Sequence, residues 1–425
     1  MQANGLAVAG GSADNSVAAA SRFWADFALR HYGRDPVEVD APPTGLAVSP
    51  EEFFALLLRS CAGRGRGPGD PRVRFHAGQR QVIADVADFL PAASDESVDG
   101  YFARLEDQLD GEPYLLVVER AQVVSRSIWK KAATFLAGLY EAAGILPGDV
   151  ELEVFVGRYP NTVPGIHREL SGVFVSMVQG VKDIFVWPPA AKGLPLETAR
   201  YSQAKASARR LRCAPGRLVY WPARHWHVGE CPAGPTAGLH LAVLEQQPSI
   251  QDLVGTAVGE LESASGSAAG LPWPGATTHE VGLPQRYEEV LRAIAGSFAD
   301  AAVVRDRLVA EWMRRRTGLG FTALPPGDSE CAIGEDHLVE TDSVLPILLA
   351  DRDGASSWLA ADGRVARLPS TPALTRLIDL LNSGEPVSAR AALALTTARA
   401  DHDVVQRTMS LLASWRALKV SAITR

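Results

Sequence analysis

The sequence contains little that would place the protein in a membrane, in an oxidising compartment or on nucleic acid. It has no apolar run approaching the roughly 20 residues that a membrane-spanning helix needs. Its 4 cysteines are scattered and form no Cys-x-x-Cys pair, which predicts reduced thiols in a cytoplasmic protein rather than a disulfide framework. The net charge of −7 supplies no basic field that would attract nucleic acid.

Length and composition predict a globular protein with more than one domain. The chain has 425 residues, of which 47% are hydrophobic and 21% are charged, as in ordinary globular proteins. Residues 1–20 are small and polar and lack the basic region of a signal peptide, so we expect a disordered tail. Residues 262–284 are rich in Ser, Gly, Ala and Pro, which predicts a linker and a domain boundary.

Helices and strands alternate in the N-terminal half of the sequence. Apolar spacing predicts helices at 20–32 and 128–143. Ser49 and Glu52 have the spacing of a capping box, and Pro50 fits the first position of the helix that follows. A continuous or alternating apolar pattern predicts strands at 114–118, 150–156 and 239–244. The polar connection at 190–212 is interpreted as either a lid or a solvated helix.

The most informative stretch is residues 165–189, which reads GIHRELSGVFVSMVQGVKDIFVWPP. His167 and Glu169 are two positions apart, so in a strand both side chains point to the same face and can reach one metal ion. The apolar run at 173–178 predicts a strand, Gln179 and Gly180 a tight turn, and 182–187 a second strand that begins with Lys182.

A further histidine pair follows in residues 216–230, which read GRLVYWPARHWHVGE. Two histidines and one carboxylate on a β scaffold suit the facial triad of non-haem Fe(II), which leaves open coordination positions. His227 is the expected third ligand. His225 competes for that place, because it lies two positions away and would share the same face of a strand.

These motifs resemble the JmjC-type cupin oxygenases, which use Fe(II) and 2-oxoglutarate. The family's His-x-Asp/Glu motif matches His167 and Glu169, although the hydroxylase branch usually has Asp there. Its Pro-x-x-x-Trp-His run matches Pro222 to His227, which favours His227 over His225. Its basic residue on the following hairpin, which pairs with the 5-carboxylate of 2-oxoglutarate, matches Lys182.

The resemblance implies a site built from seven residues. His167, Glu169 and His227 would hold Fe(II) and Lys182 would anchor 2-oxoglutarate. Further hydrogen bonds to the cosubstrate are expected from Thr162, Ser176 and His240. Each of these three also has a purely structural interpretation, as an ordinary buried hydroxyl or a neutral core histidine.

The resemblance also implies a fold of the α+β class. We expect a double-stranded β-helix (cupin or jelly-roll) core with flanking N-terminal helices at 21–261. A helical segment at 285–320 and a winged-helix-like module at 321–425 would follow. This order resembles the ribosomal-protein hydroxylases, whose helical segment forms a homodimer, so we expect a dimer.

The expected activity is that of a 2-oxoglutarate-dependent dioxygenase. It would hydroxylate a C–H bond of an amino-acid side chain in a protein or a ribosomally made peptide. Two other classes remain open. One is a metal-binding cupin with redox-neutral chemistry, which would not need Lys182. The other is a non-catalytic interaction protein that keeps the fold.

Overall fold

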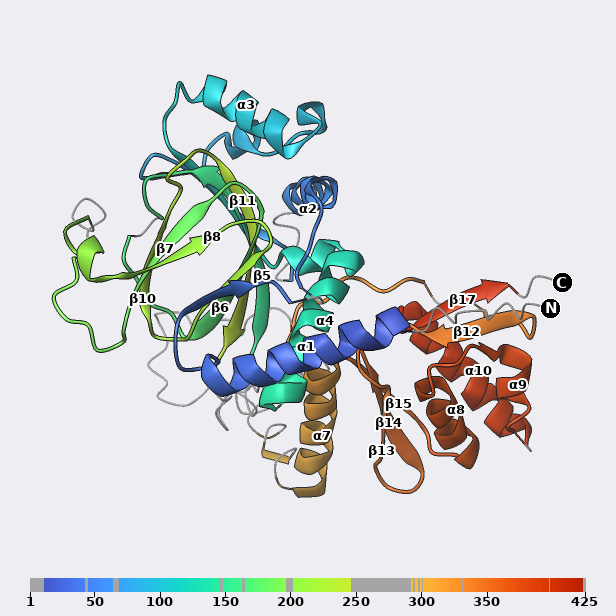
Figure 1. Cartoon of the computed structure of the whole chain (residues 1–425). Helices are drawn as coiled ribbons and strands as arrows, with labels where there is room; N and C mark the ends of the chain where they lie inside the picture. Colours follow the sequence, from blue (N-terminus) through green and yellow to red (C-terminus); the bar gives the residue numbers. More distant parts are fainter. Residues whose placement is uncertain are drawn as a thin grey trace, which may run out of the picture. The chain divides into compact units, whose positions relative to one another are not determined.

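The structure is a computed structural model with helices and strands along most of the chain (Figure 1). It describes residues 11–42, 45–63, 69–144, 148–162, 165–195, 202–245, 301–329, 332–396 and 398–422, together with 292, 295, 296 and 299. The predicted linker at 262–284 and the first part of the predicted helical segment lie outside the described residues.

The chain divides into two units, and each contains both helices and antiparallel sheets. The first unit consists of Met1–Gln246 and Leu319–Gly327, and the second of Gln247–Gly318 and Asp328–Arg425. The helices of the first unit are α1 (Gly11–Arg30), α2 (Pro50–Gly63), α3 (Val98–Gln108) and α4 (Arg126–Ala143). Its strands are β1 (Val37–Asp40), β2 (Arg72–Ala77), β3 (Arg80–Val82), β4 (Tyr114–Glu119), β5 (Val150–Arg158), β6 (Ser171–Gln179), β7 (Lys182–Trp187), β8 (Arg209–Cys213), β9 (Arg217–Trp221), β10 (Trp226–Glu230) and β11 (Thr236–Leu244).

Two antiparallel sheets form the centre of the first unit. The larger has eight strands in the order β1-β9-β6-β11-β5-β4-β2-β3, and the smaller has the order β10-β7-β8. The turn between β6 and β7 includes Gly180, whose positive φ of 75° favours glycine. Because β6 belongs to the large sheet and β7 to the small one, this turn leads from one sheet to the other.

Strand β6 shows how side-chain alternation separates two packed regions. Val173, Val175 and Met177 lie in one buried cluster together with residues of β7 and β8. Phe174 points to the opposite face, where its ring packs against Trp24 of α1 and Phe135 of α4. The first face encloses the interior between the two sheets, and the second packs on the helices.

The helix ends follow the capping signals of the sequence. The amide of Glu52 donates to Ser49 Oγ and the amide of Ser49 to Glu52 Oε2, both at 3.2 Å, so the predicted capping box is confirmed. Ser125 caps α4 in the same manner by accepting from the amide of Ile128. Helix α1 begins at Gly11, earlier than the start at residue 20 that apolar spacing predicted.

The connection at 190–212 differs from its interpretation as a solvated helix. Its described part contains a short 3₁₀ turn, Lys205–Ser207, and the strand β8. Leu211 and Cys213 of β8 are buried, whereas Arg209, Arg210 and Arg212 are exposed. Because three of the five residues of β8 are arginines and only two side chains enter the core, the apolar alternation typical of a strand was too weak to predict it. The segment is a strand because it pairs with β7.

The second unit has its own hydrophobic core. Thr371 caps α8 by accepting from the amide of Leu374 at 3.1 Å, with Pro372 in the first turn. Its helices are α7 (Ala301–Thr317), α8 (Pro372–Asn382), α9 (Ala389–Leu393) and α10 (Arg399–Ser414). Its strands are β12 (His337–Thr341), β13 (Leu348–Asp351), β14 (Ser356–Ala361), β15 (Arg364–Pro369), β16 (Val387–Ser388) and β17 (Leu418–Ala422), in the sheets β16-β12-β17 and β13-β14-β15.

The predicted class of mixed helix and antiparallel sheet is confirmed. The closure into a jelly roll and the winged-helix character of the second unit stay predictions. Among the described residues, none of the helices combines the length and the apolar character that crossing a bilayer requires.

Candidate metal centre

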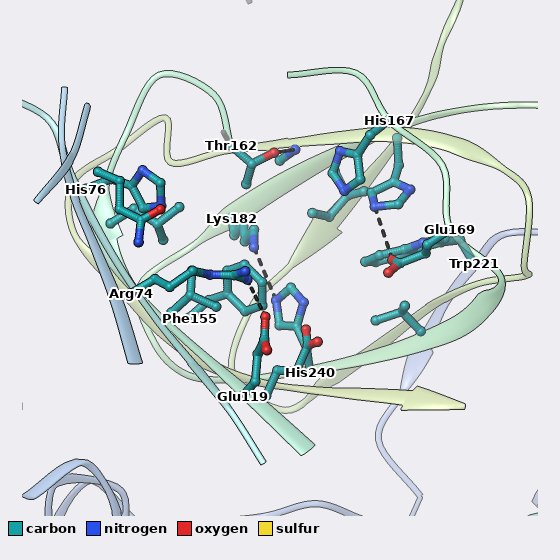
Figure 2. A pocket seen from close by; sticks show the side chains of 18 residues that line it. Arg74, His76, Glu119, Phe155, Thr162, His167, Glu169, Lys182, Trp221 and His240 are labelled. Atoms are coloured by element: carbon teal, nitrogen blue, oxygen red, sulfur yellow. Dashed lines mark hydrogen bonds and ion pairs between the residues drawn. The ribbon is translucent and has the colours of Figure 1, made fainter. Parts of the chain in front are cut away.

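A cavity of about 380 Å³ opens in the first unit, lined by both of its sheets. Figure 2 shows His167 and Glu169 on one side of it, Arg74 and His76 on the other, and Lys182 between them. The lining side chains are Arg74, His76, Gln81, Leu115, Val117, Glu119, Glu153, Phe155, Thr162, His167, Glu169, Val173, Lys182, Ile184, Trp221, His227 and His240, with Gly229. Six of the seven residues proposed from the sequence line this one cavity.

His167 and His227 lie directly opposite each other on paired backbone segments. The amide of His167 donates to the carbonyl of His227 at 3.1 Å, and the amide of His227 donates back to His167 at 2.8 Å. This antiparallel bridge brings the two imidazole ring centres to 4.3 Å. The pairing of β10 with β7 fixes His227 from its other side, opposite Val186.

Both imidazoles are prepared to act as metal ligands. His167 Nδ1 lies 2.8 Å from the carbonyl oxygen of Gly165, and His227 Nδ1 lies 3.2 Å from that of His225. A carbonyl can only accept, so each Nδ1 carries the proton and each Nε2 keeps a free lone pair. Burial lowers the pKa of His167, and it lowers that of His227 well below its usual value. Both rings are therefore neutral, as metal coordination requires.

Glu169 completes the group with a carboxylate. Its Oε1 lies 3.4 Å from His227 Nε2, and the ligand atoms of the three residues all lie within 4.8 Å of one another. An ion about 2.1 Å from each ligand atom needs neighbouring ligand atoms about 3 Å apart, so small side-chain rotations suffice. Enclosure raises the pKa of Glu169 to about 7. Two imidazoles and one carboxylate fit a divalent first-row metal.

Lys182 is the most unusual side chain of the cavity because a cation is buried there with 1% of its surface exposed. Its Nζ lies 3.2 Å from His240 Nε2, and it sits 4.6 Å from the ring centre of Phe155. Among the described residues, no carboxylate forms an ion pair with it. Burial lowers the pKa of Lys182, as expected for an ammonium taken out of water.

Thr162 and Gly229 form the wall beside this lysine. The amide of Gly229 donates to Thr162 Oγ1 at 3.1 Å, and the amide of Thr162 donates to the carbonyl of Gly229 at 2.7 Å. A Cβ atom at position 229 would lie 2.7 Å from Lys182 Cε and 3.0 Å from Ile184 Cδ1. A side chain at this position would therefore displace the end of Lys182 from its present place.

Two residues considered from the sequence lie elsewhere. Ser176 shares the outer face of β6 with Phe174, and its Oγ donates to the carbonyl of Leu46 at 3.4 Å, so the structure does not bring it to the cavity. His225 precedes β10 and is not among the residues that line the cavity. The structure brings His227, and not His225, to His167 and Glu169.

Several cavity residues were not identified from the sequence. Arg74 and Glu119 form an ion pair on the neighbouring strands β2 and β4. Glu153 and Phe155 project from β5, and Trp221 from β9. The alternation of apolar and acidic residues at 150–156 was the available signal, since Glu153 and Phe155 share one face of that strand.

Glu153 gives the cavity a pH-dependent effect on stability. Burial, and then the charge of Glu169, raises its pKa to about 8, against about 4.3 in an unfolded chain. Between these values the folded protein binds a proton that the unfolded chain releases, so the free energy of unfolding falls as the pH rises from about 5 to 8. Each unit of pKa difference corresponds to about 1.4 kcal/mol, which sets the effect at a few kcal/mol at most.

We therefore expect Glu153→Gln to make the metal-free protein less sensitive to pH. The free energy of unfolding should fall less between pH 5 and pH 8 in the variant than in the wild type, because the amide has no proton to lose. Urea denaturation across this range in the presence of a chelator measures the effect. The exposed Glu141 on α4 gives the control substitution Glu141→Gln. A parallel pH dependence for the wild type and Glu153→Gln would contradict the interpretation.

Comparison with known proteins finds a similarity in structure only. No family model matches the sequence, and no curated protein matches it significantly. An X-ray structure of E. coli YcfD superimposes with a TM-score of 0.50 at 15% identity, covering 94% of this chain and 98% of that one. YcfD is a ribosomal oxygenase from Escherichia coli, and its complex with cobalt and 2-oxoglutarate gives a TM-score of 0.48 at 14% identity, with the same coverage. The similarity in fold that the motif resemblance implied is thus found with YcfD, over almost the full length of both chains.

Proposed function

We propose that the protein is an Fe(II)- and 2-oxoglutarate-dependent oxygenase that hydroxylates a C–H bond of an amino-acid side chain in a protein or a ribosomally made peptide. The observation that carries this proposal is Lys182, a buried ammonium in the same cavity as the three candidate metal ligands. Burying a charge without an opposite charge is costly. A cavity that holds such a cation beside a metal centre is suited to an anion that also coordinates the metal.

2-Oxoglutarate has the chemistry that these two features require. Its keto and 1-carboxylate oxygens can coordinate a metal, and its 5-carboxylate remains free for the ammonium of Lys182. Thr162 lies in the same wall and accepts from Gly229, so its hydroxyl proton can still be donated to the cosubstrate. Fe(II) and 2-oxoglutarate, when bound, supply the oxidising chemistry with O₂.

The protein's own residues position these groups and limit the access of water. His167, His227 and Glu169 provide three ligands from one side and leave the remaining coordination positions open. Trp221 packs 4.8 Å from the ring centre of His227, and Val173 lies opposite Trp221 on the next strand. This apolar wall shields the metal side of the cavity.

A second hollow shares part of its lining with the main cavity. This hollow of about 250 Å³ is lined by Glu153 and Glu169, which line the main cavity as well. Because the two spaces share these side chains, we propose that the substrate reaches the metal through the second hollow. A polypeptide substrate is supported by the fold shared with YcfD, a ribosomal oxygenase.

Four further features belong to the proposal. The two sheets of the first unit form the double-stranded β-helix, the second unit contains a winged-helix-like module, and the protein works in the cytoplasm. It also forms a homodimer through its helical segment. The exposed side chains of Leu308 and Trp312, one turn apart on α7, support such pairing. We expect light scattering of the purified protein to give twice the mass of one protomer, and a monomer at micromolar concentration would contradict the dimer.

The test is binding and turnover of 2-oxoglutarate by the wild-type protein. Calorimetry should detect 2-oxoglutarate binding when a divalent metal is present and little binding after chelation. With Fe(II), O₂ and candidate peptides, succinate should be released and the substrate should gain the mass of one oxygen atom. If the metal-loaded protein binds no 2-oxoglutarate, the oxygenase proposal is wrong and a redox-neutral cupin or an interaction protein is favoured.

A further inference from the structure

We infer that His240 is a positioning residue that holds the ammonium of Lys182 without neutralising its charge. This inference rests on the proposed function, because it concerns the affinity of the same cavity for 2-oxoglutarate. It assigns to His240 an action on Lys182 rather than a direct contact with the metal. Three features carry it: which atom donates, what fixes the imidazole ring, and the chemistry of an uncharged acceptor.

The hydrogen bond between the two side chains has one possible direction. Lys182 Nζ and His240 Nε2 are 3.2 Å apart (Figure 2). An ammonium group has three donors and no acceptor, so His240 Nε2 must accept and Nδ1 must carry the ring proton. Burial, and then the charge of Lys182, lowers the pKa of His240 well below its usual value. The imidazole is therefore a neutral acceptor.

The position of His240 in the sheet leaves its ring little freedom. Strand β11 lies between β5 and β6, where His240 is opposite Glu153 on one side and Val175 on the other. Its ring stacks on Phe155 with centres 4.1 Å apart and an interplanar angle of 24°. The ring of Trp221 meets it nearly edge-on at 6.3 Å and 81°. A ring fixed in this way can determine where the end of a flexible lysine lies.

Besides His240, the neighbours of the Lys182 ammonium among the described residues are aromatic rings rather than a carboxylate. Phe155 and Tyr159 present their rings at 4.6 Å and 5.7 Å from Nζ, a contact that stabilises a cation without cancelling it. An aspartate or glutamate at position 240 would also hold the lysine, but it would form an ion pair with it. Such a pair would compete with the carboxylate of the cosubstrate. A neutral acceptor gives orientation and leaves the full charge for an incoming anion.

Three substitutions of His240 separate this role from simple packing. His240→Gln keeps a neutral acceptor at similar reach, His240→Phe keeps the stacked ring but removes the acceptor, and His240→Glu keeps the reach of Gln but adds a negative charge. We expect the dissociation constant of 2-oxoglutarate to stay near the wild-type value for Gln and to rise roughly tenfold for Phe, the loss expected for one hydrogen bond. It should rise most for Glu. If the ring were needed only for packing, Phe would instead be the mildest change.

The experiment uses calorimetric titration of 2-oxoglutarate into each metal-loaded protein, with the metal affinity measured separately. The metal affinity should be similar in all variants, because His240 is not part of the metal group. If His240→Phe or His240→Glu binds 2-oxoglutarate as tightly as the wild type, the inference about His240 is wrong and the oxygenase proposal stands. If the metal-loaded wild type does not bind 2-oxoglutarate, both are wrong. If Phe prevents folding, the Gln and Glu variants, which match in shape and differ in charge, decide the question.

Discussion

Replacing His227 with alanine is expected to abolish tight metal binding and, with it, any metal-dependent turnover. His227 is buried, its Nε2 lies 3.4 Å from Glu169, and its Nδ1 is bonded to a backbone carbonyl. No side chain other than His167 and Glu169 forms part of this ligand group within the described residues. Loss of partners that merely orient a ligand costs about 10–100-fold in metal affinity. Loss of the ligand itself should therefore cost at least about a hundredfold.

The neighbouring His225 provides a matched control for this experiment. It is the same residue type, it lies two positions away, and it belongs to the same Pro-x-x-x-Trp-His run. Because its side chain does not line the cavity, His225→Ala should retain metal affinity close to that of the wild type. Competition with a chromophoric chelator, using cobalt or manganese, measures both variants. Wild-type affinity in His227→Ala, or loss of metal by His225→Ala alone, would refute the assignment.

The second large effect is expected for Lys182→Ala, which should weaken 2-oxoglutarate binding roughly ten- to hundredfold. The variant loses a charge-assisted contact worth about 1.5–3 kcal/mol, while the metal ligands are unchanged. Lys182→Arg should recover part of the affinity, since a guanidinium can pair with a carboxylate through two hydrogen bonds but needs more space. Gly229 and Thr162 close the wall beside the lysine and limit that space.

Lys205 is the control for charge and for aromatic contact. Its Nζ lies 4.5 Å from the ring centre of Phe185, and it pairs with Glu230 at 2.7 Å outside the cavity. Lys205→Ala removes a lysine that also contacts an aromatic ring, and it should leave the dissociation constant of 2-oxoglutarate unchanged because Lys205 lies outside the cavity and pairs with Glu230. Titration of 2-oxoglutarate into the metal-loaded variants measures the difference. An unchanged dissociation constant in Lys182→Ala would mean that the cosubstrate does not bind at this lysine.

The local elements around the metal site were predictable because they depend on short-range patterns. Strand β7 has the predicted bounds of 182–187, since its apolar run follows a turn that requires glycine at position 180. The capping box at Ser49 depends on only four residues. The prediction that His167 and His227 share one metal site came from the motif resemblance. No local sequence pattern shows that these two distant segments are paired through their backbones.

The remainder of the cavity could not be predicted because several strands contribute one or two side chains each. Arg74, Glu119 and Glu153 come from β2, β4 and β5, and their proximity depends on the strand order of the large sheet. Ser176 shows a second limit. Both faces of β6 are buried, so the sequence contained no contrast between an inner and an outer face. Alternation alone could not show that Val173 faces the cavity and that Ser176 lies on the opposite face of the sheet.

The backbone bridge between His167 and His227 has a consequence for the stability of the first unit. The two residues are separated by about 60 positions in the sequence, yet their amides and carbonyls are directly paired. A metal ion bound to both imidazoles would be a reversible cross-link that closes a long loop. For a covalent link of this span, the chain-entropy model gives about 4 kcal/mol of restriction on the unfolded state. Metal binding would then stabilise the pairing between the segment before β6 and the strand β10, and removal of the metal would weaken it.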